Sequence, residues 1–297
     1  MIEAIPAYLD RWGTHPSWSR MLGNPALYPQ IETRLTELLG APDSLVLPTL
    51  THIHASVIPV LASDGTIFVD SRAHKTIWDG CVAARGPRRH RGPLRPRVRG
   101  RGGAGPRGDI SPYGRRGNGV VRHLGETYDN IVLTGGFSKA YSSLLAFVAC
   151  PPELKRLLKV TAPPYLYSGP SPVASLASVL VGLQVNEARG DDLRAILWAR
   201  TRRVLDHLEK LGAFTLNRSG FPIVEVPLAD ADDLAKAGRF LLDQGIYVTL
   251  AFYPGVPREE VGFRIQLTAA NTDDEVSELL VALDRLADVV PLRPRPF

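Results

Sequence analysis

A lysine placed directly after an apolar stretch is the residue best suited to covalent chemistry in this sequence. Residues 131–141 read IVLTGGFSKAY, so a predicted strand runs into a glycine turn and then into Ser138 and Lys139. Lysine is rarely buried without a function, and its removal from water favours the neutral amine, which attacks carbonyl carbons. Neighbouring hydroxyl groups, including that of Thr134, and glycine amides suit a phosphate. We therefore expect a buried nucleophilic amine beside an anion site; the alternative is a lysine on an exposed turn.

Other residues have types and positions that suit ligand binding. Arg264 interrupts an otherwise apolar strand, and a guanidinium binds a carboxylate through two parallel hydrogen bonds. The alternative is an edge-strand arginine whose head group reaches water. His74 follows a short predicted strand, where a surface histidine is the alternative. His52 and His54 could ligate a metal, but the sequence offers no third ligand, so we predict no metal site.

Helices and strands alternate along the chain and must position these residues. Apolar spacing predicts helices over 28–39, 55–61, 153–160, 172–188, 191–211, 231–244 and 273–288, the last opened by a Thr272–Glu275 capping box. Pro59 is expected to break or start the second of these. Strands are expected over 44–47, 66–69, 130–133, 144–149, 214–216, 223–226, 246–250 and 263–267. This alternation predicts a layered α/β protein with a domain boundary inside or after the helix that starts at Asp191.

The composition is that of an ordinary globular protein. The chain has 297 residues, of which 44% are hydrophobic and 22% charged, and no apolar run approaches the ~20 residues that span a bilayer. The N-terminus lacks a basic region followed by an apolar core, so we expect no signal peptide. The two cysteines, Cys81 and Cys150, form neither a disulfide framework nor a metal knuckle. We expect a cytoplasmic protein that does not bind a membrane.

The basic character of the chain is confined to one segment. Residues 85–108 contain nine Arg, seven Gly, four Pro and no acid. The net charge is +5, but the other residues carry 26 Lys and Arg against 30 Asp and Glu, a net charge of −4. Residues 85–112 cannot bury enough apolar surface to offset chain entropy, and we expect them to be disordered. The GxGxxG pattern at 100–105 follows no predicted strand and is not interpreted as a dinucleotide site.

Four segments, in this order along the chain, resemble motifs of the fold type I pyridoxal-phosphate (PLP) enzymes. The similarity is to the α-oxoamine synthase branch of the aminotransferase class I/II family, which includes 8-amino-7-oxononanoate synthase and glycine C-acetyltransferase. Residues 70–76 (DSRAHKT) resemble D-x-x-x-H-x-S, residues 134–140 resemble T-x-SK-A, and residues 167–170 (YSGP) resemble the Y-S-x-S/P turn. Residues 262–272 resemble R-x-R-x-x-x-T-A-A-H-T. The threonine that this family places three residues before its lysine is replaced by Gly136.

The resemblance implies a role for each matching residue. Lys139 would be the Schiff-base lysine and an acid/base catalyst, and His74 would stack on the cofactor ring. Arg264 would bind the substrate carboxylate. The residues that would bind the cofactor phosphate are Thr49 and Leu50 at a backbone turn, Thr134, Ser138, and Ser168 from a neighbouring subunit.

The resemblance also implies an architecture and an activity. We expect an α/β, fold type I transferase with an incomplete, mostly parallel sheet in its large domain and a smaller C-terminal α/β domain. The expected parts are an N-terminal arm over 1–27, a PLP-binding domain over 28–190 and a small domain over 191–297. The activity would be a condensation of an amino acid with an acyl thioester in a homodimer that binds no nucleic acid.

One motif of that branch is missing. A D-x-A-H motif, whose aspartate keeps the pyridine nitrogen of PLP protonated, should lie between His74 and Lys139. The only acid between Asp79 and Glu126 is Asp109, with no histidine three residues on.

Two hypotheses explain residues 85–108: an out-of-frame read of a GC-rich gene with a deletion, or a genuine Arg/Gly-rich arm that binds nucleic acid. The first is preferred, because the segment lacks aromatic residues for base stacking. The alternatives for the whole chain are an aminotransferase and a catalytically inactive relative that acts as a binding protein.

Overall fold

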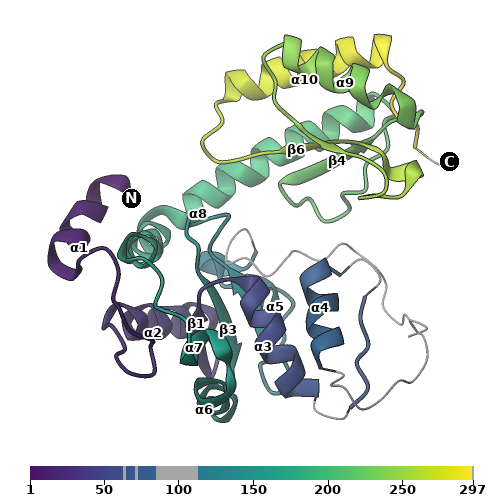
Figure 1. The fold of residues 1–297 in the computed structure, drawn as a ribbon. Coiled ribbons are helices and arrows are strands. Elements are labelled where there is room, and N and C mark those ends of the chain that lie inside the picture. Colours follow the sequence, from purple (N-terminus) through teal and green to yellow (C-terminus); the bar gives the residue numbers. More distant parts are fainter. Residues whose placement is uncertain (63–64, 71–72, 85–112, 296–297) are drawn as a thin grey trace. The chain divides into compact units, whose positions relative to one another are not determined.

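The structure is a computed structural model that describes residues 1–62, 65–70, 73–84 and 113–295. The described residues form two compact units, Met1–Gly190 and Asp191–Phe297 (Figure 1). The expected disordered segment over 85–112 lies outside the described residues. None of the described helices combines the length and the apolar character that a membrane crossing requires.

The first unit is built around a sheet of three strands in the order β1-β3-β2. Both pairings are antiparallel. Val148 of the central strand β3 lies opposite Leu45 of β1 on one side and opposite Thr134 of β2 on the other. The expectation of a mostly parallel sheet is therefore wrong for the described strands, because β3 runs against both neighbours. The elements are α1 (Ile5–Trp12), α2 (Leu27–Leu39), β1 (Asp43–Leu47), α3 (Leu50–Ala62), α4 (Lys75–Ala83), α5 (Gly119–His123), β2 (Leu133–Gly136), β3 (Ala146–Cys150), α6 (Pro152–Thr161), α7 (Pro163–Leu166) and the first part of α8 (Val173–Lys210), with 3₁₀ turns at Ile2–Ala4 and Arg115–Gly117.

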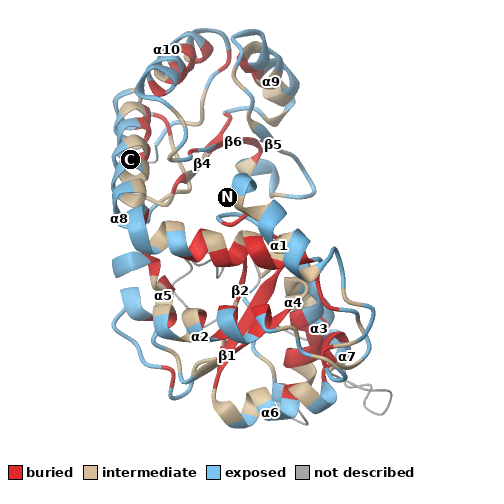
Figure 2. Ribbon diagram, turned by 90° about the vertical axis from the view of Figure 1, so that its left-hand side faces the viewer, coloured by how far each residue is buried: buried red, intermediate tan, exposed pale blue. Residues whose placement is uncertain are grey.

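Helices cover both faces of this sheet, and most residues of its strands are buried. Val46 and Phe147 lie in one buried cluster with residues of α2 and α8. Leu45 and Val148, one position away, lie in a second cluster with residues of α3 and α6. Alternate residues of a strand point to opposite faces, and in Figure 2 the strands of this sheet are coloured largely as buried. The result is a three-layer α/β/α arrangement.

The second unit has one covered sheet face. Its strands pair antiparallel in the order β4-β6-β5. Val224, Val226, Phe263 and Ile265 form its core with residues of the helices, whereas Glu225 and Arg264 alternate with them and lie on the other face. The elements are the second part of α8, β4 (Ile223–Pro227), α9 (Leu234–Asp243), β5 (Thr249–Ala251), β6 (Gly262–Gln266) and α10 (Asp273–Val289), with 3₁₀ turns at Ala231–Asp233 and Arg258–Glu260.

Most expected elements are found within a few residues, and five differ. Helix α3 begins at Leu50 and continues through Pro59, so this proline neither starts nor ends it. The helices expected over 172–188 and 191–211 form one helix, α8, interrupted only at Arg189, whose φ of −148° is not helical. Residues 66–69 are not a strand, and they have no partner strand among the described residues. Residues 214–216 are not a strand either, although Ala213 forms an isolated bridge with Pro294.

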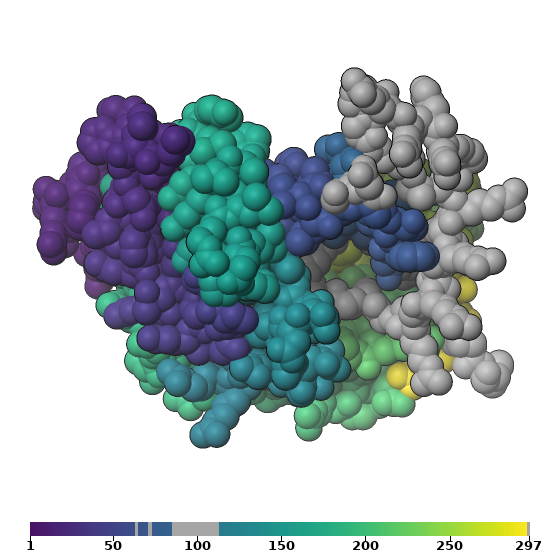
Figure 3. Space-filling view, turned by 90° about the horizontal axis from the view of Figure 1, so that it is seen from below, coloured from purple at the N-terminus to yellow at the C-terminus, as the bar shows by residue number. Residues whose placement is uncertain are grey.

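A buried group of charges fastens the N-terminal residues to the first unit. Arg20 is 3% exposed and donates to Glu32 at 2.9 Å, while its guanidinium lies over the ring of Tyr28. Lys155 of α6 lies 3.2 Å from Glu32 and 2.7 Å from Asp43. Burial acts to lower the pKa of Lys155, but the two carboxylates outweigh it and raise that pKa. Figure 3, which views the molecule from below, shows the segment of α6 and α7 next to the N-terminal residues.

Candidate active site

The turn that carries Lys139 is held by the aromatic residue before it. Phe137 is fully buried, its N–H donates to Leu145 O at 2.8 Å, and its carbonyl accepts from the N–H of Tyr141 at 3.1 Å. The rings of Phe137 and Tyr141 also pack edge to face. These contacts lift Ser138 and Lys139 out of the core, and both side chains are exposed. The expected burial of Lys139 is therefore wrong in the chain as described, where its amine faces water.

The backbone turn after β1 becomes the start of a helix. Thr49 precedes α3, and its hydroxyl oxygen accepts from the N–H of His52 at 3.3 Å, as an N-cap residue does. Leu50 is the first residue of α3, and both side chains are half-buried. The first N–H groups of a helix have no partner within it and favour anions. This is the kind of position that the sequence analysis expected for a phosphate.

His74 caps the helix that follows it. Its Nδ1 accepts from the backbone N–H of Thr76 at 3.3 Å and lies 2.9 Å from the hydroxyl oxygen of Thr76. The side chain is otherwise exposed. The ring is thus held at the start of α4 through one nitrogen, while the rest of the imidazole remains accessible.

His54 joins these segments, and sequence reasoning missed it. It is 8% exposed, and its Nδ1 lies 2.9 Å from the Thr76 hydroxyl of α4. Its Nε2 lies 3.4 Å from the Thr134 hydroxyl of β2. Burial, together with the nearby His74, lowers the pKa of His54. The sequence suggests His54 only as a possible metal ligand with His52, but its apolar neighbours along α3 are a signal that its side chain is buried.

A glycine allows α4 to approach α3 this closely. A Cβ atom on Gly80 would lie 2.5 Å from the carbonyl oxygen of His54 and 2.8 Å from Cδ1 of Ile58. Real Cβ atoms do not come so near to backbone atoms, so any larger residue would separate the helices. The hydrogen bond between His54 and Thr76 depends on this contact.

Two expected site residues lie elsewhere. Ser168 follows α7 in the first unit and is half-buried. Arg264 belongs to β6 of the second unit, where its Nε lies 3.5 Å from Oε1 of Glu225 on the neighbouring strand. Thr249 of β5 is its partner on the other side. A carboxylate therefore already faces the arginine that was expected to bind the substrate carboxylate.

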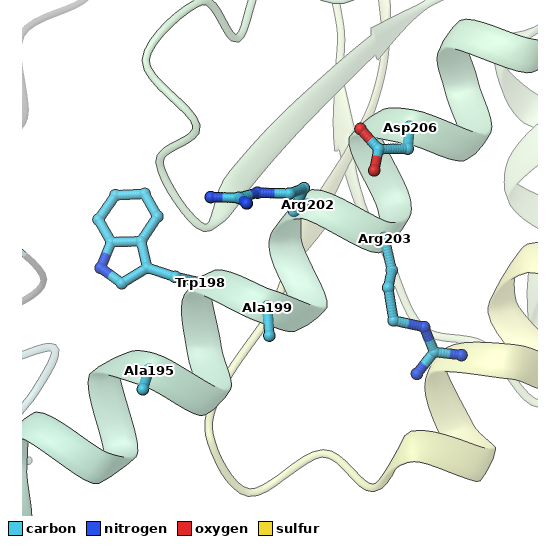
Figure 4. A pocket seen from close by; sticks show the side chains of 6 residues that line it. All are labelled: Ala195, Trp198, Ala199, Arg202, Arg203 and Asp206. Carbon is cyan, nitrogen blue, oxygen red and sulfur yellow. The ribbon is translucent and has the colours of Figure 1, made fainter.

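A shallow hollow in the second unit does not coincide with these residues. It is lined by Trp198, Arg202, Arg203 and three other residues of α8 (Figure 4). Arg203 also lies 3.4 Å from Asp273 and 3.0 Å from the hydroxyl of Ser277. All lining residues come from one helix, so this is a surface feature and not an enclosed site.

The donors of the first unit fit most of the PLP molecule. The start of α3 and the hydroxyl of Ser138 suit its phosphate, the accessible ring of His74 suits its pyridine ring, and the exposed amine of Lys139 suits its aldehyde. No described residue between Asp79 and Glu126 supplies the carboxylate that should keep the pyridine nitrogen protonated. The only acid of the sequence between Asp79 and Glu126 is Asp109, which lies outside the described residues.

Known proteins share both the sequence and the fold. The family described as aminotransferase class I and II matches residues 104–283. The 8-amino-7-oxononanoate synthase of Symbiobacterium thermophilum is 27% identical over 330 positions, covering 96% of this chain and 83% of the relative. The 2-amino-3-ketobutyrate coenzyme A ligase of Escherichia coli K12 is 33% identical over 156 positions, covering 52% of this chain and 39% of the relative. A serine palmitoyltransferase from S. paucimobilis, solved with a bound PLP–myriocin aldimine, has a TM-score of 0.83 at 20% identity and covers 97% of this chain and 83% of its own.

The first of these alignments also shows a deficit. It extends over 330 positions, whereas 96% of this chain is about 285 residues, so about 45 positions of the relative have no counterpart here. The match over 104–283 spans more than half of the chain. This chain therefore belongs to the aminotransferase class I and II family and has the fold of the fold type I PLP enzymes.

Proposed function

We propose that this protein is a PLP-dependent transferase that condenses an amino acid with an acyl thioester of coenzyme A, as α-oxoamine synthases do. The observation that carries the proposal is the convergence of β2, α3 and α4 through His54, which brings the strand leading to Lys139 next to His74. The names of two relatives support acyl-CoA and amino-acid substrates. One is a 2-amino-3-ketobutyrate coenzyme A ligase, and the other is an 8-amino-7-oxononanoate synthase.

Each residue has a defined task in this proposal. Bound PLP supplies an aldehyde for amines and a ring that withdraws electrons from the carbon next to the amino group. Lys139 would hold the cofactor through its amine and would move protons to and from the substrate. The imidazole of His74 would hold the ring, and the hydroxyl of Ser138 and the N–H groups of Thr49 and Leu50 would hold the phosphate.

The second unit would bind the amino-acid substrate. Arg264 binds the amino-acid carboxylate through its guanidinium, which has the planar geometry for two parallel hydrogen bonds. The substrate must compete with Glu225, whose carboxylate lies 3.5 Å from the same group. We therefore propose weak amino-acid binding, which strengthens when Glu225 is neutralised by substitution to Gln.

A homodimer is the assembly that we propose. Ser168 would reach the phosphate of the neighbouring subunit. Support comes from Trp18, Met21 and Leu22, which are 52%, 64% and 79% exposed although they are apolar and close in sequence. Exposed apolar side chains this close in sequence support an interaction surface at this segment. Leu22→Glu should convert a sedimenting dimer to a monomer, and a wild-type monomer would refute this part.

A binding protein without rapid turnover is the second candidate. It is favoured by the missing pyridine-nitrogen carboxylate and by the deficit of about 45 positions. Without a protonated ring, electron withdrawal is weak and we expect slow chemistry. Sequencing the gene across codons 81–113 separates a frameshift product from a genuine arm.

The test is a visible absorbance spectrum of the purified chain with added PLP. The band of a PLP–lysine adduct should form in wild type and in Lys210→Ala, which changes an exposed lysine of the second unit, and should be absent in Lys139→Ala. An equal band in Lys139→Ala would refute the proposal. Product formation that needs acyl-CoA distinguishes a synthase, whereas transfer of an amino group to a 2-oxo acid would indicate an aminotransferase.

A further inference from the structure

Four side chains, one of them His54, form a hydrogen-bonded chain. The donor and the acceptor of each hydrogen bond in it can be assigned. The order is His74, Thr76, His54 and Thr134, with separations of 2.9, 2.9 and 3.4 Å between the bonded atoms. Thr76 belongs to α4, His54 to α3 and Thr134 to β2, and His74 is the residue that caps α4. A neutral imidazole has one donor and one acceptor nitrogen, and a hydroxyl has one proton to give.

The first link fixes the direction of the others. Nδ1 of His74 accepts the backbone N–H of Thr76 and therefore carries no proton. The Thr76 hydroxyl must then donate to that nitrogen, which uses its single proton. Its oxygen can only accept from His54, so Nδ1 of His54 carries a proton.

The donor of the last hydrogen bond, between His54 and Thr134, follows from the charge of His54. Burial and the neighbouring His74 lower the pKa of His54, which keeps the ring neutral at neutral pH. A neutral ring protonated at Nδ1 has a bare Nε2, so Thr134 donates its hydroxyl proton there. Thr134 then presents only oxygen lone pairs to anything else.

We infer that His54 is a positioning residue that is held in its Nδ1-protonated form. Its hydrogen bonds connect β2 to the start of α4, where His74 lies, and its Nε2 accepts the hydroxyl proton of Thr134. The consequence for the cofactor rests on the proposed function. A phosphate binds hydrogen-bond donors, and Thr134 has none left, so the phosphate donors are Ser138 and the start of α3. This removes Thr134 from the phosphate-binding residues that the sequence suggested.

The direct test is the protonation state of each ring in the full chain without cofactor. Long-range ¹H–¹⁵N correlation spectra of histidine-labelled protein, recorded well above the usual histidine pKa of 6.5, distinguish the two neutral forms. Loss of signals in His54→Gln and His74→Gln assigns them. We expect His54 to be protonated at Nδ1, the minor form of a free side chain, and His74 at Nε2. A His54 protonated at Nε2 in wild type would overturn the inference.

Variants of Thr76 separate this role from general packing. Thr76→Val keeps the shape but removes the hydroxyl, and it should return His54 to the Nε2-protonated form, whereas Thr76→Ser should preserve the wild-type spectrum. Thr161→Val is the matched control, because Thr161 is an exposed helical threonine that donates to Leu157 O. An unchanged His54 signal in Thr76→Val would also contradict the inference.

The role of Thr134 is tested by PLP affinity. Ser138→Ala should weaken binding by about tenfold, whereas Thr134→Val should leave it within about twofold, since its proton is already used. An equal loss in both variants would contradict the assignment for Thr134. Failure of the wild type to bind PLP would refute the proposed function, while the histidine spectra would still decide the inference.

Discussion

The two units of this protein differ in how completely their sheets are enclosed. The first unit packs helices against both faces of β1-β3-β2 and buries alternate residues of the same strand in two clusters. The second unit packs helices against one face of β4-β6-β5 and keeps Glu225 and Arg264 on the other. The functional residues follow this difference. In the first unit they sit at strand ends and helix starts, and in the second a charged residue occupies the middle of a strand.

The difference indicates where a sheet has room for polar chemistry. A strand covered on both faces has no position for a charge, so its functional groups must lie beyond its end. In the second unit, the middle of a strand carries Arg264 on the face opposite the core, where its half-buried side chain faces Glu225 on the neighbouring strand. Polar groups do enter the interior of the first unit, and Arg20, Glu32 and His54 are examples that have hydrogen-bond partners there.

Removal of Glu32 should give the largest effect. In Glu32→Ala the guanidinium of Arg20 and the amine of Lys155 lose a shared carboxylate in a buried place. We expect the free energy of unfolding of the first unit to fall by ~3–5 kcal/mol. Hydrogen exchange measured separately for each unit in increasing urea would detect this.

The control for that experiment is Glu278→Ala, which removes an exposed acid of α10. It should change neither unit by more than about 0.5 kcal/mol. An equal loss of protection in both units of Glu32→Ala would show that they do not unfold independently.

A methyl group at Gly80 should have the next effect. Gly80→Ala forces α4 away from the His54 carbonyl, and overpacking of this kind costs ~1–3 kcal/mol. The His54–Thr76 hydrogen bond should break as well, which the histidine spectra report. Asp79→Ala, at an exposed neighbouring position of the same helix, should leave both properties nearly unchanged; similar spectra in the two variants would argue against the tight contact.

Loss of a helix cap in the second unit should be smaller. Thr272 accepts from the N–H of Glu275 at 3.1 Å, and the Glu275 carboxylate accepts from the N–H of Thr272 at 2.9 Å. Thr272→Ala should lower the stability of the second unit by ~1 kcal/mol. Thr272→Ser should restore most of it, and the first unit should show no change in hydrogen exchange.

The smallest expected effect depends on pH. The pKa of His54 is lower in the folded first unit than its usual value of 6.5, so the unfolded chain binds the additional proton first. Its contribution to stability is complete above pH 6.5 and is lost as the pH falls toward the lower, folded-state pKa. His54→Gln should remove this part of the pH dependence of unfolding, and an unchanged slope below pH 6.5 would contradict it.

Sequence patterns predicted the elements that depend on local information. The capping box at Thr272, the amphipathic helix α2 and the strands of the core are present because their signals lie within a few neighbouring residues. The Lys139 motif also indicated the family, which the match over 104–283 confirms.

What could not be predicted depends on distant partners. The segment 66–69 has the composition of a strand, but a strand exists only beside another one, and none of the described strands pairs with it. The burial of Lys139 was expected from the apolar residues before it, yet the anchoring of Phe137 turns the lysine outward. The role of His54 depends on Thr76 of α4 and Thr134 of β2, which are distant from it in the sequence.

The pairing of β1 with β3 sets the order in which the chain can acquire structure. Asp43 pairs with Cys150, so more than a hundred residues must leave the ribosome before the sheet of the first unit can form. The second unit pairs Ile223 with Gln266 and closes over a much shorter stretch. Long-range pairing slows folding. During synthesis the apolar residues of β1 and α3 therefore stay exposed until β3 has been made. We expect chaperone assistance to matter most for the folding of the first unit.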